Sequence, residues 1–157
     1  MIFRKAEGID AKELAEIRWD FQYDPRDGSP EPELSRGEFI SYCADFLEES
    51  LIGESWVCWI AEERGQIISQ IFIKKIRKIP KPKRLYDAYG YVTNVYTRPE
   101  FRNKGIGRQL MTKVKEWAIE EDLELLIVWP SQKSIGFYES MGFSSDNEIR
   151  NCILRED

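Results

Sequence analysis

Apolar side chains recur at helical spacing in three parts of the chain, residues 14–21, 39–47 and 110–118. Two of these stretches follow a residue that can cap a helix, with a glutamate three positions further on, which is the capping-box pattern. The two pairs are Asp10 with Glu13 and Ser35 with Glu38. A shorter helix is predicted over residues 134–140, where Gly142 would end it.

Segments typical of β-strands lie between and beyond these helices. Residues 55–62, 66–75 and 88–97 are rich in β-branched and aromatic side chains. Residues 123–129 form a near-continuous apolar run, which predicts a central strand buried on both faces. Short strands are also expected at residues 2–6 and after Phe143. The resulting order, β-α-α-β-β-β-α-β-α-β-β, indicates a mixed α/β sheet.

The length of the chain fits this interpretation. A chain of 157 residues, 42% of them hydrophobic, can bury a real core but leaves little room for a second one. We therefore expect a single domain spanning residues 1–157.

Composition narrows the chemistry. The sequence contains no histidine, which excludes Ser-His-Asp and Cys-His catalysis and the common histidine zinc sites. Its three cysteines, at positions 43, 58 and 152, show no metal-ligand spacing, so we expect no metal and a reduced, cytoplasmic setting. Neither a membrane-spanning run nor an apolar leader is evident, and no membrane partner is expected.

Charge is distributed unevenly along the chain. Residues 74–84 carry seven positive charges and no acid, whereas residues 1–63 hold sixteen acids against six bases. The basic run has no aromatic side chain for base stacking, and its proline-punctuated pattern predicts an exposed hairpin arm. Binding of nucleic acid by this arm is an alternative function that we disfavour, and the arm could also contact a dimer partner.

The most informative segment is a strand that runs into a glycine-containing turn before a helix, residues 91–110. The first turn of a helix has unpaired N–H groups, and its dipole attracts an anion. Gly105 and Gly107 allow the backbone to approach such an anion closely, and Arg102, Lys104 and Arg108 add positive charge. Because the P-loop and three-glycine dinucleotide patterns are both missing, the sequence predicts a phosphate or pyrophosphate site of another kind.

The pattern R-x-x-G-x-G from Arg102 to Gly107 resembles the pyrophosphate-binding motif of the GNAT superfamily of acyl-CoA-dependent N-acetyltransferases. The segment W-P-S-Q-K-S-I-G-F-Y-E-S-M-G-F, from Trp129 to Phe143, is similar to a strand-to-helix segment of the same superfamily. The resemblance implies a three-layer fold with a central mixed sheet of about seven strands and about four helices. It also implies acetyl-CoA as the acyl donor.

Specific roles follow from the resemblance. The pantetheine arm of acetyl-CoA would insert between two splayed strands, and Tyr138 would protonate the departing thiolate. The implied cofactor-binding residues are Val95, Thr97, Arg102, Asn103, Lys104, Gly105, Ile106, Gly107, Arg108, Ser131, Ser134 and Tyr138. The amine must lose its proton, and the candidate bases are Asp87 or water held by Tyr91, Asn94 or Tyr96.

The acceptor is expected near residues 19–36 and the strands of residues 55–75. The acidic character of residues 1–63 favours a cationic amine: a polyamine, an aminoglycoside, an amino-acid derivative or a protein amine. An alternative of a different class is a non-catalytic acyl-CoA-binding module of the same fold.

Overall fold

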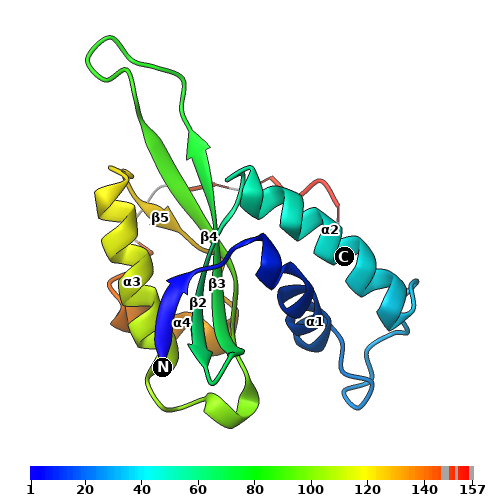
Figure 1. Cartoon of the computed structure of the whole chain (residues 1–157). Coiled ribbons are helices and arrows are strands. Elements are labelled where there is room, and N and C mark those ends of the chain that lie inside the picture. The colour runs from blue at the N-terminus through cyan, green and yellow to red at the C-terminus, as the bar shows by residue number, and fades with distance from the viewer. Residues whose placement is uncertain (146–148, 151, 156–157) are drawn as a thin grey trace.

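A five-stranded mixed sheet forms the centre of the protein in the computed structural model, which describes residues 1–145, 149–150 and 152–155 (Figure 1). The strands lie side by side in chain order: β1 (Ile2–Lys5), β2 (Val57–Glu63), β3 (Gln66–Arg77), β4 (Ala88–Thr97) and β5 (Leu126–Ile127). Neighbours from β1 to β4 are antiparallel, whereas β5 pairs with β4 in parallel. The predicted mixed α/β class is confirmed.

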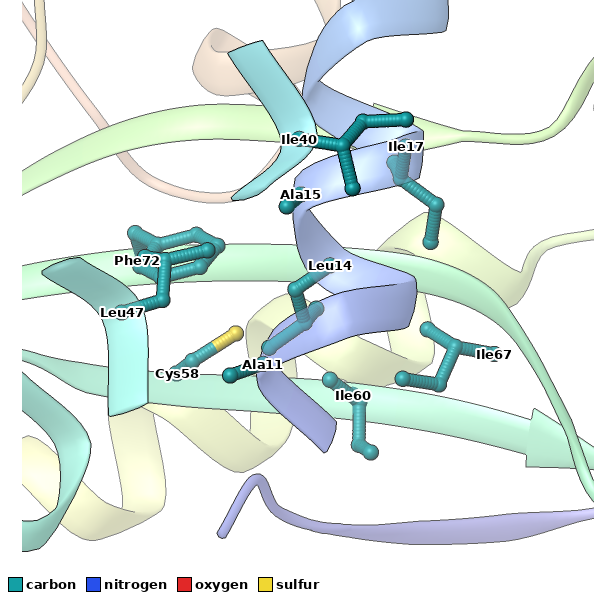
Figure 2. Packing of buried hydrophobic residues seen from close by; sticks show 10 residues of the cluster. All are labelled: Ala11, Leu14, Ala15, Ile17, Ile40, Leu47, Cys58, Ile60, Ile67 and Phe72. Atoms are coloured by element: carbon teal, nitrogen blue, oxygen red, sulfur yellow. The ribbon is translucent and has the colours of Figure 1, made fainter. Parts of the chain in front are cut away.

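Helices cover both faces of the sheet and create three layers. One face carries α1 (Ala11–Gln22) and α2 (Arg36–Ile52), and the other carries α3 (Ile106–Glu120) and α4 (Ile135–Ser140). Successive side chains of β3 point to opposite faces of the sheet, which explains the two cores. Phe72 packs against α1 and α2, while Ile71 and Ile73 pack against α3. Figure 2 shows the first core, in which Leu14 of α1 lies above the sheet.

The two predicted capping boxes have different outcomes. Ser35 caps α2 as expected, because its Oγ accepts a hydrogen bond from the Glu38 N–H and the Glu38 carboxylate accepts one from the Ser35 N–H. The Asp10–Glu13 box is wrong. Asp10 accepts hydrogen bonds from the Glu7 N–H and the Arg4 guanidinium, and Glu13 Oε1 accepts one from the N–H of Ile67, 2.8 Å away.

The prediction for residues 123–129 requires correction. Only Leu126–Ile127 form a strand, and β5 lies at the edge of the sheet, so Leu125 and Trp129 remain 43% and 61% exposed. About seven strands were expected, whereas the described residues form five. No strand forms at the described positions 143–145, 149–150 and 152–155, and the remainder of that prediction lies outside the described residues.

The basic stretch forms the predicted arm. Residues 78–87 connect β3 to β4 and project beyond the end of the sheet (Figure 1). Ion pairs join its base to the loop after α3: Lys78 contacts Glu124, and the Arg84 guanidinium lies 3.0 Å from a carboxylate oxygen of Asp122. Acids thus pair with part of the positive charge of the basic stretch, and nucleic-acid binding by the arm stays the disfavoured alternative.

Within the described residues, no helix combines the length and apolar character that crossing a membrane would require.

Candidate active site

An opening forms where β4 and β5 separate. The two strands pair only at Gly90 with Leu126 and at Tyr91 with Ile127, although β4 continues to Thr97. The close approach depends on Gly90, since a Cβ at that position would lie 2.6 Å from Leu126 Cδ2. Beyond Tyr91, the edge of β4 that faces away from β3 therefore has no strand partner among the described residues.

A β-bulge at Asn94 redirects the backbone along this open edge. Asn94 has a φ of 51°, and the register with β3 shifts at this point. The N–H of Arg98 donates to Ile68 O of β3, so the alternate residues Val95 and Thr97 turn their backbone groups to the open side. The main-chain contacts predicted for these two residues stay a prediction, and Thr97 O already accepts a hydrogen bond from Arg102 Nε.

The loop before α3 presents N–H groups at the same end of β4. Asn103 and Gly105 both adopt left-handed backbone conformations, with φ values of 60° and 76°. The first helical hydrogen bond runs from the Gln109 N–H to Gly105 O, so the preceding amides have no intrahelical acceptor. Left-handed residues beside a helix N-terminus are typical of anion-binding concavities, so the pyrophosphate site stays a prediction at this loop.

The basic side chains near this loop divide into two groups. Arg102 and Lys104 are exposed; Arg102 Nε donates to Thr97 O, and Lys104 lies over the Phe101 ring. The Arg108 guanidinium instead donates to Ser140 Oγ at 2.9 Å and joins α3 to α4. We therefore expect Arg108 to serve an anion mainly through its backbone N–H.

Tyr138 lies within the second core. Its ring packs edge-on against Phe137 and Phe143, and it lines a cavity of about 630 Å³ with Trp129. Burial raises the pKa of the Tyr138 hydroxyl, so this group keeps its proton at neutral pH, as a general acid must.

Ser131 and Ser134 stand at the turn before α4. Ser131 is exposed and Ser134 is partly buried. Ser131 Oγ donates to Ser134 Oγ at 3.1 Å, and Ser134 Oγ donates to Ser131 O. Their hydroxyl groups thus bond to each other in a turn that lies between β5 and α4.

Asp87 does not suit the role of base. It is 2% exposed and lies near Lys78, Lys81 and Arg84 at the base of the arm. Burial opposes its charge, but the Lys81 hydrogen bond and the neighbouring charges outweigh burial and hold the pKa of Asp87 below its ordinary value. Asn94 is seven residues further along β4, roughly 20 Å away at the rise of a strand.

Sequence reasoning missed two residues that contact the bulge. Arg18 of α1 donates to Asn94 Oδ1 at 3.0 Å, and the buried Gln70 of β3 donates from Nε2 to Asn94 O at 3.4 Å. Nothing in the sequence indicated a role for Arg18, because its partner Asn94 is 76 positions away. Gln70 was recognisable in the sequence as a polar residue that follows a serine inside an otherwise apolar strand.

Comparisons with known proteins agree with this geometry. Residues 11–143 match the family described as "Acetyltransferase (GNAT) family". A predicted acetyltransferase from Clostridium acetobutylicum, crystallised with acetyl-CoA, superposes with a TM-score of 0.76 at 27% identity, covering 98% of this chain and 96% of that one. A GCN5-related N-acetyltransferase from Ralstonia eutropha JMP134 shares the fold, with a TM-score of 0.73 at 24% identity, covering 98% and 99%.

A curated relative shows a shorter match. The L-ornithine N5-acetyltransferase NATA1 of Arabidopsis thaliana is 31% identical over 70 residues, which are 43% of this chain. The match spans 31% of that relative's length.

Proposed function

The chain belongs to the GNAT acetyltransferase family, and on that premise we propose that it transfers the acetyl group of acetyl-CoA to an amine by direct attack in a ternary complex. The observation that carries the proposal is the opening beside β4. There, the edge of β4 that carries Val95 and Thr97 has no strand partner among the described residues and leads to the amide-lined loop before α3.

The loop and the open strand suit two parts of acetyl-CoA. The N–H groups of residues 103–108, with the side chains of Arg102 and Lys104, suit the pyrophosphate. The backbone groups of Val95 and Thr97 suit the amides of the pantetheine arm. The turn that holds Ser131 and Ser134 would border this arm from the β5 side.

When bound, acetyl-CoA supplies an activated acyl carbon and a thiolate leaving group. The backbone N–H groups at the Asn94 bulge would stabilise the oxyanion that forms as the amine nitrogen bonds to this carbon. As the carbon–sulfur bond breaks, Tyr138 donates its proton to the departing sulfur. The amine nitrogen loses a proton to solvent and Tyr138 regains one from solvent, so that the protons balance.

The amine must arrive without its proton. A lysine-like amine with a pKa near 10.4 pays about 4–5 kcal/mol for deprotonation at pH 7. With Asp87 remote from the bulge, water held by Asn94, Tyr91 or Tyr96 is the remaining candidate for the base. A site that excludes bulk water also lowers the free-energy cost of deprotonating the amine, because desolvation favours the neutral amine.

The acceptor would approach from the α1–α2 side of β4. A cavity of about 180 Å³ lies there, between the two helices and Asn94. The excess of acids in residues 1–63 supports a cationic amine, and the similarity to a relative named for ornithine supports an amino-acid derivative among the candidates. A protein amine remains within this proposal.

A broad amine screen tests the proposal. Purified protein is incubated with acetyl-CoA and single amines, and free CoA thiol is measured against a no-acceptor control. We expect thiol release with at least one amine, accompanied by a mass increase of that amine equal to one acetyl group. Binding of acetyl-CoA without thiol release for any amine would instead support the non-catalytic module.

A further inference from the structure

Arg18 differs from the other partly buried arginines in its partners. Arg4 pairs with Asp10 and Glu62, and Arg98 pairs with Glu13. Arg18 is also partly buried, yet it has no carboxylate within ion-pair distance among the described residues. Its contacts are one hydrogen bond to Asn94 Oδ1 and the ring of Phe21, whose centroid lies 5.9 Å away.

An unpaired guanidinium in this position is energetically unfavourable. Burial lowers the pKa of Arg18 because the charged form loses hydration, and charged groups removed from water are normally paired. A guanidinium carries five N–H donors, of which the bond to Asn94 uses one. The remaining donors are able to receive a planar anion in the bidentate geometry that arginine favours.

The cavity beside Arg18 supplies the space for such an anion. Its volume is about 180 Å³, and the residues that line it come from α1, α2, β3, β4 and the position just before β2. They are Arg18, Cys43, Phe46, Leu47, Trp56, Phe72, Thr93 and Asn94. Arg18 is the charged residue among them, and the remaining walls are mostly apolar. A polyamine, positively charged at both ends, would find no counter-charge in this lining.

We propose that Arg18 binds a carboxylate of the acceptor, so that the substrate is a small amine that also carries a carboxylate, as amino acids do. The inference rests on the proposed function and selects one class among its acceptors. Because Arg18 contacts Asn94 at the bulge, a carboxylate bound there holds the rest of the acceptor near the open edge of β4. The small cavity favours a free amino acid over a protein chain.

Matched pairs of acceptors test the inference. The two members of each pair differ only by a carboxylate. The pairs are ornithine with putrescine, lysine with cadaverine, and β-alanine with ethylamine. Values of kcat/KM are measured by thiol release at saturating acetyl-CoA. For at least one pair, we expect the carboxylate-bearing member to exceed its partner by about 10- to 100-fold, which is the range of a charge-assisted hydrogen bond at a partly buried site.

Variants assign that preference to Arg18. Arg18→Gln should bring the ratio within a pair close to one, and Arg18→Lys should retain part of it, because lysine keeps the charge but loses the planar fork. The KM for acetyl-CoA should stay within about twofold. Arg36→Gln removes an exposed arginine from α2 and should leave the ratio unchanged.

Two results would overturn the inference. One is a wild-type enzyme that acetylates the carboxylate-free members as well as or better than their partners. The other is an Arg18→Gln variant that loses activity equally with both members, since this would show that Arg18 only supports the bulge through Asn94. If the wild type released thiol with no amine, the proposed function itself would fail instead.

Discussion

Replacing Gly90 with alanine should weaken the fold at the point where β4 and β5 meet. A Cβ at Gly90 would lie 2.6 Å from Leu126 Cδ2, 3.1 Å from Ile73 Cγ2 and 3.4 Å from Leu123 Cδ1. Carbon atoms in contact prefer about 3.5–4.0 Å, so Leu126 must move by about 1 Å. Because three side chains surround the site, rotation of one of them alone does not create enough space.

The magnitude follows from two opposing effects. Overpacking a core typically costs about 1–3 kcal/mol. Alanine restricts the unfolded chain more than glycine does, and this effect stabilises the folded state by about 0.4–1 kcal/mol. We therefore expect Gly90→Ala to lower the free energy of unfolding by about 1–2 kcal/mol, or to lower Tm by about 2–8 °C for a chain of this size.

Urea unfolding followed by tryptophan fluorescence measures this change, and a double-mutant cycle tests its cause. If Leu126 is the obstacle, Gly90→Ala combined with Leu126→Ala should be at least about 1 kcal/mol more stable than the sum of the single effects. Gly37→Ala is the control, because a Cβ there meets nothing within 4 Å and alanine favours the α2 helix. Wild-type stability of Gly90→Ala, or strict additivity in the cycle, would refute the reasoning.

Three further predictions concern the site and the fold. Gly107→Glu should abolish turnover, because a carboxylate would stand where the diphosphate must rest; wild-type thiol release would contradict this. Tyr138→Phe should lower kcat by about 10²-fold with little change in the KM for acetyl-CoA, and an unchanged kcat would exclude the tyrosine as the acid. Asp10→Asn should destabilise the protein by about 1–3 kcal/mol at pH 7, because the Arg4 hydrogen bond holds the pKa of Asp10 below its ordinary 3.8. This stabilisation is present above pH 3.8 and is lost as the pH falls through the lowered pKa, so the urea midpoints of the two proteins should converge once the pH is below that pKa.

Local sequence signals predicted the elements that depend on local physics. The β-branched run at residues 88–97 matches β4 residue for residue, and Ser35 caps α2 because its partner Glu38 lies one turn away. Gly105 directly precedes α3 as expected, and its left-handed conformation is one that glycine readily adopts.

Long-range contacts decided the features that were predicted wrongly. Asp10 and Glu13 satisfy a capping pattern, but Arg4 and the N–H of Ile67 offer them stronger partners in the folded chain. The apolar run at residues 123–129 indicated a central strand, yet sequence alone does not reveal whether a further strand will cover it.

The same distinction applies to the candidate site. The glycine-containing loop was recognisable because its residues are contiguous. The environment of Asn94 was not recognisable from the sequence, because Arg18 and Gln70 contact Asn94 from separate elements. Asp87 was chosen for its position beside β4 in the sequence, and the three cations around it become evident only in three dimensions.

The central claim is that backbone amides before and at the start of α3 bind the diphosphate of coenzyme A. An NMR titration of the ¹⁵N-labelled protein with coenzyme A reports on those amides individually. We expect the largest shifts at residues 103–108, and we expect them to be much smaller with pantetheine, which lacks the diphosphate. Binding of coenzyme A without a shift in the NMR signals of these amides would contradict the account.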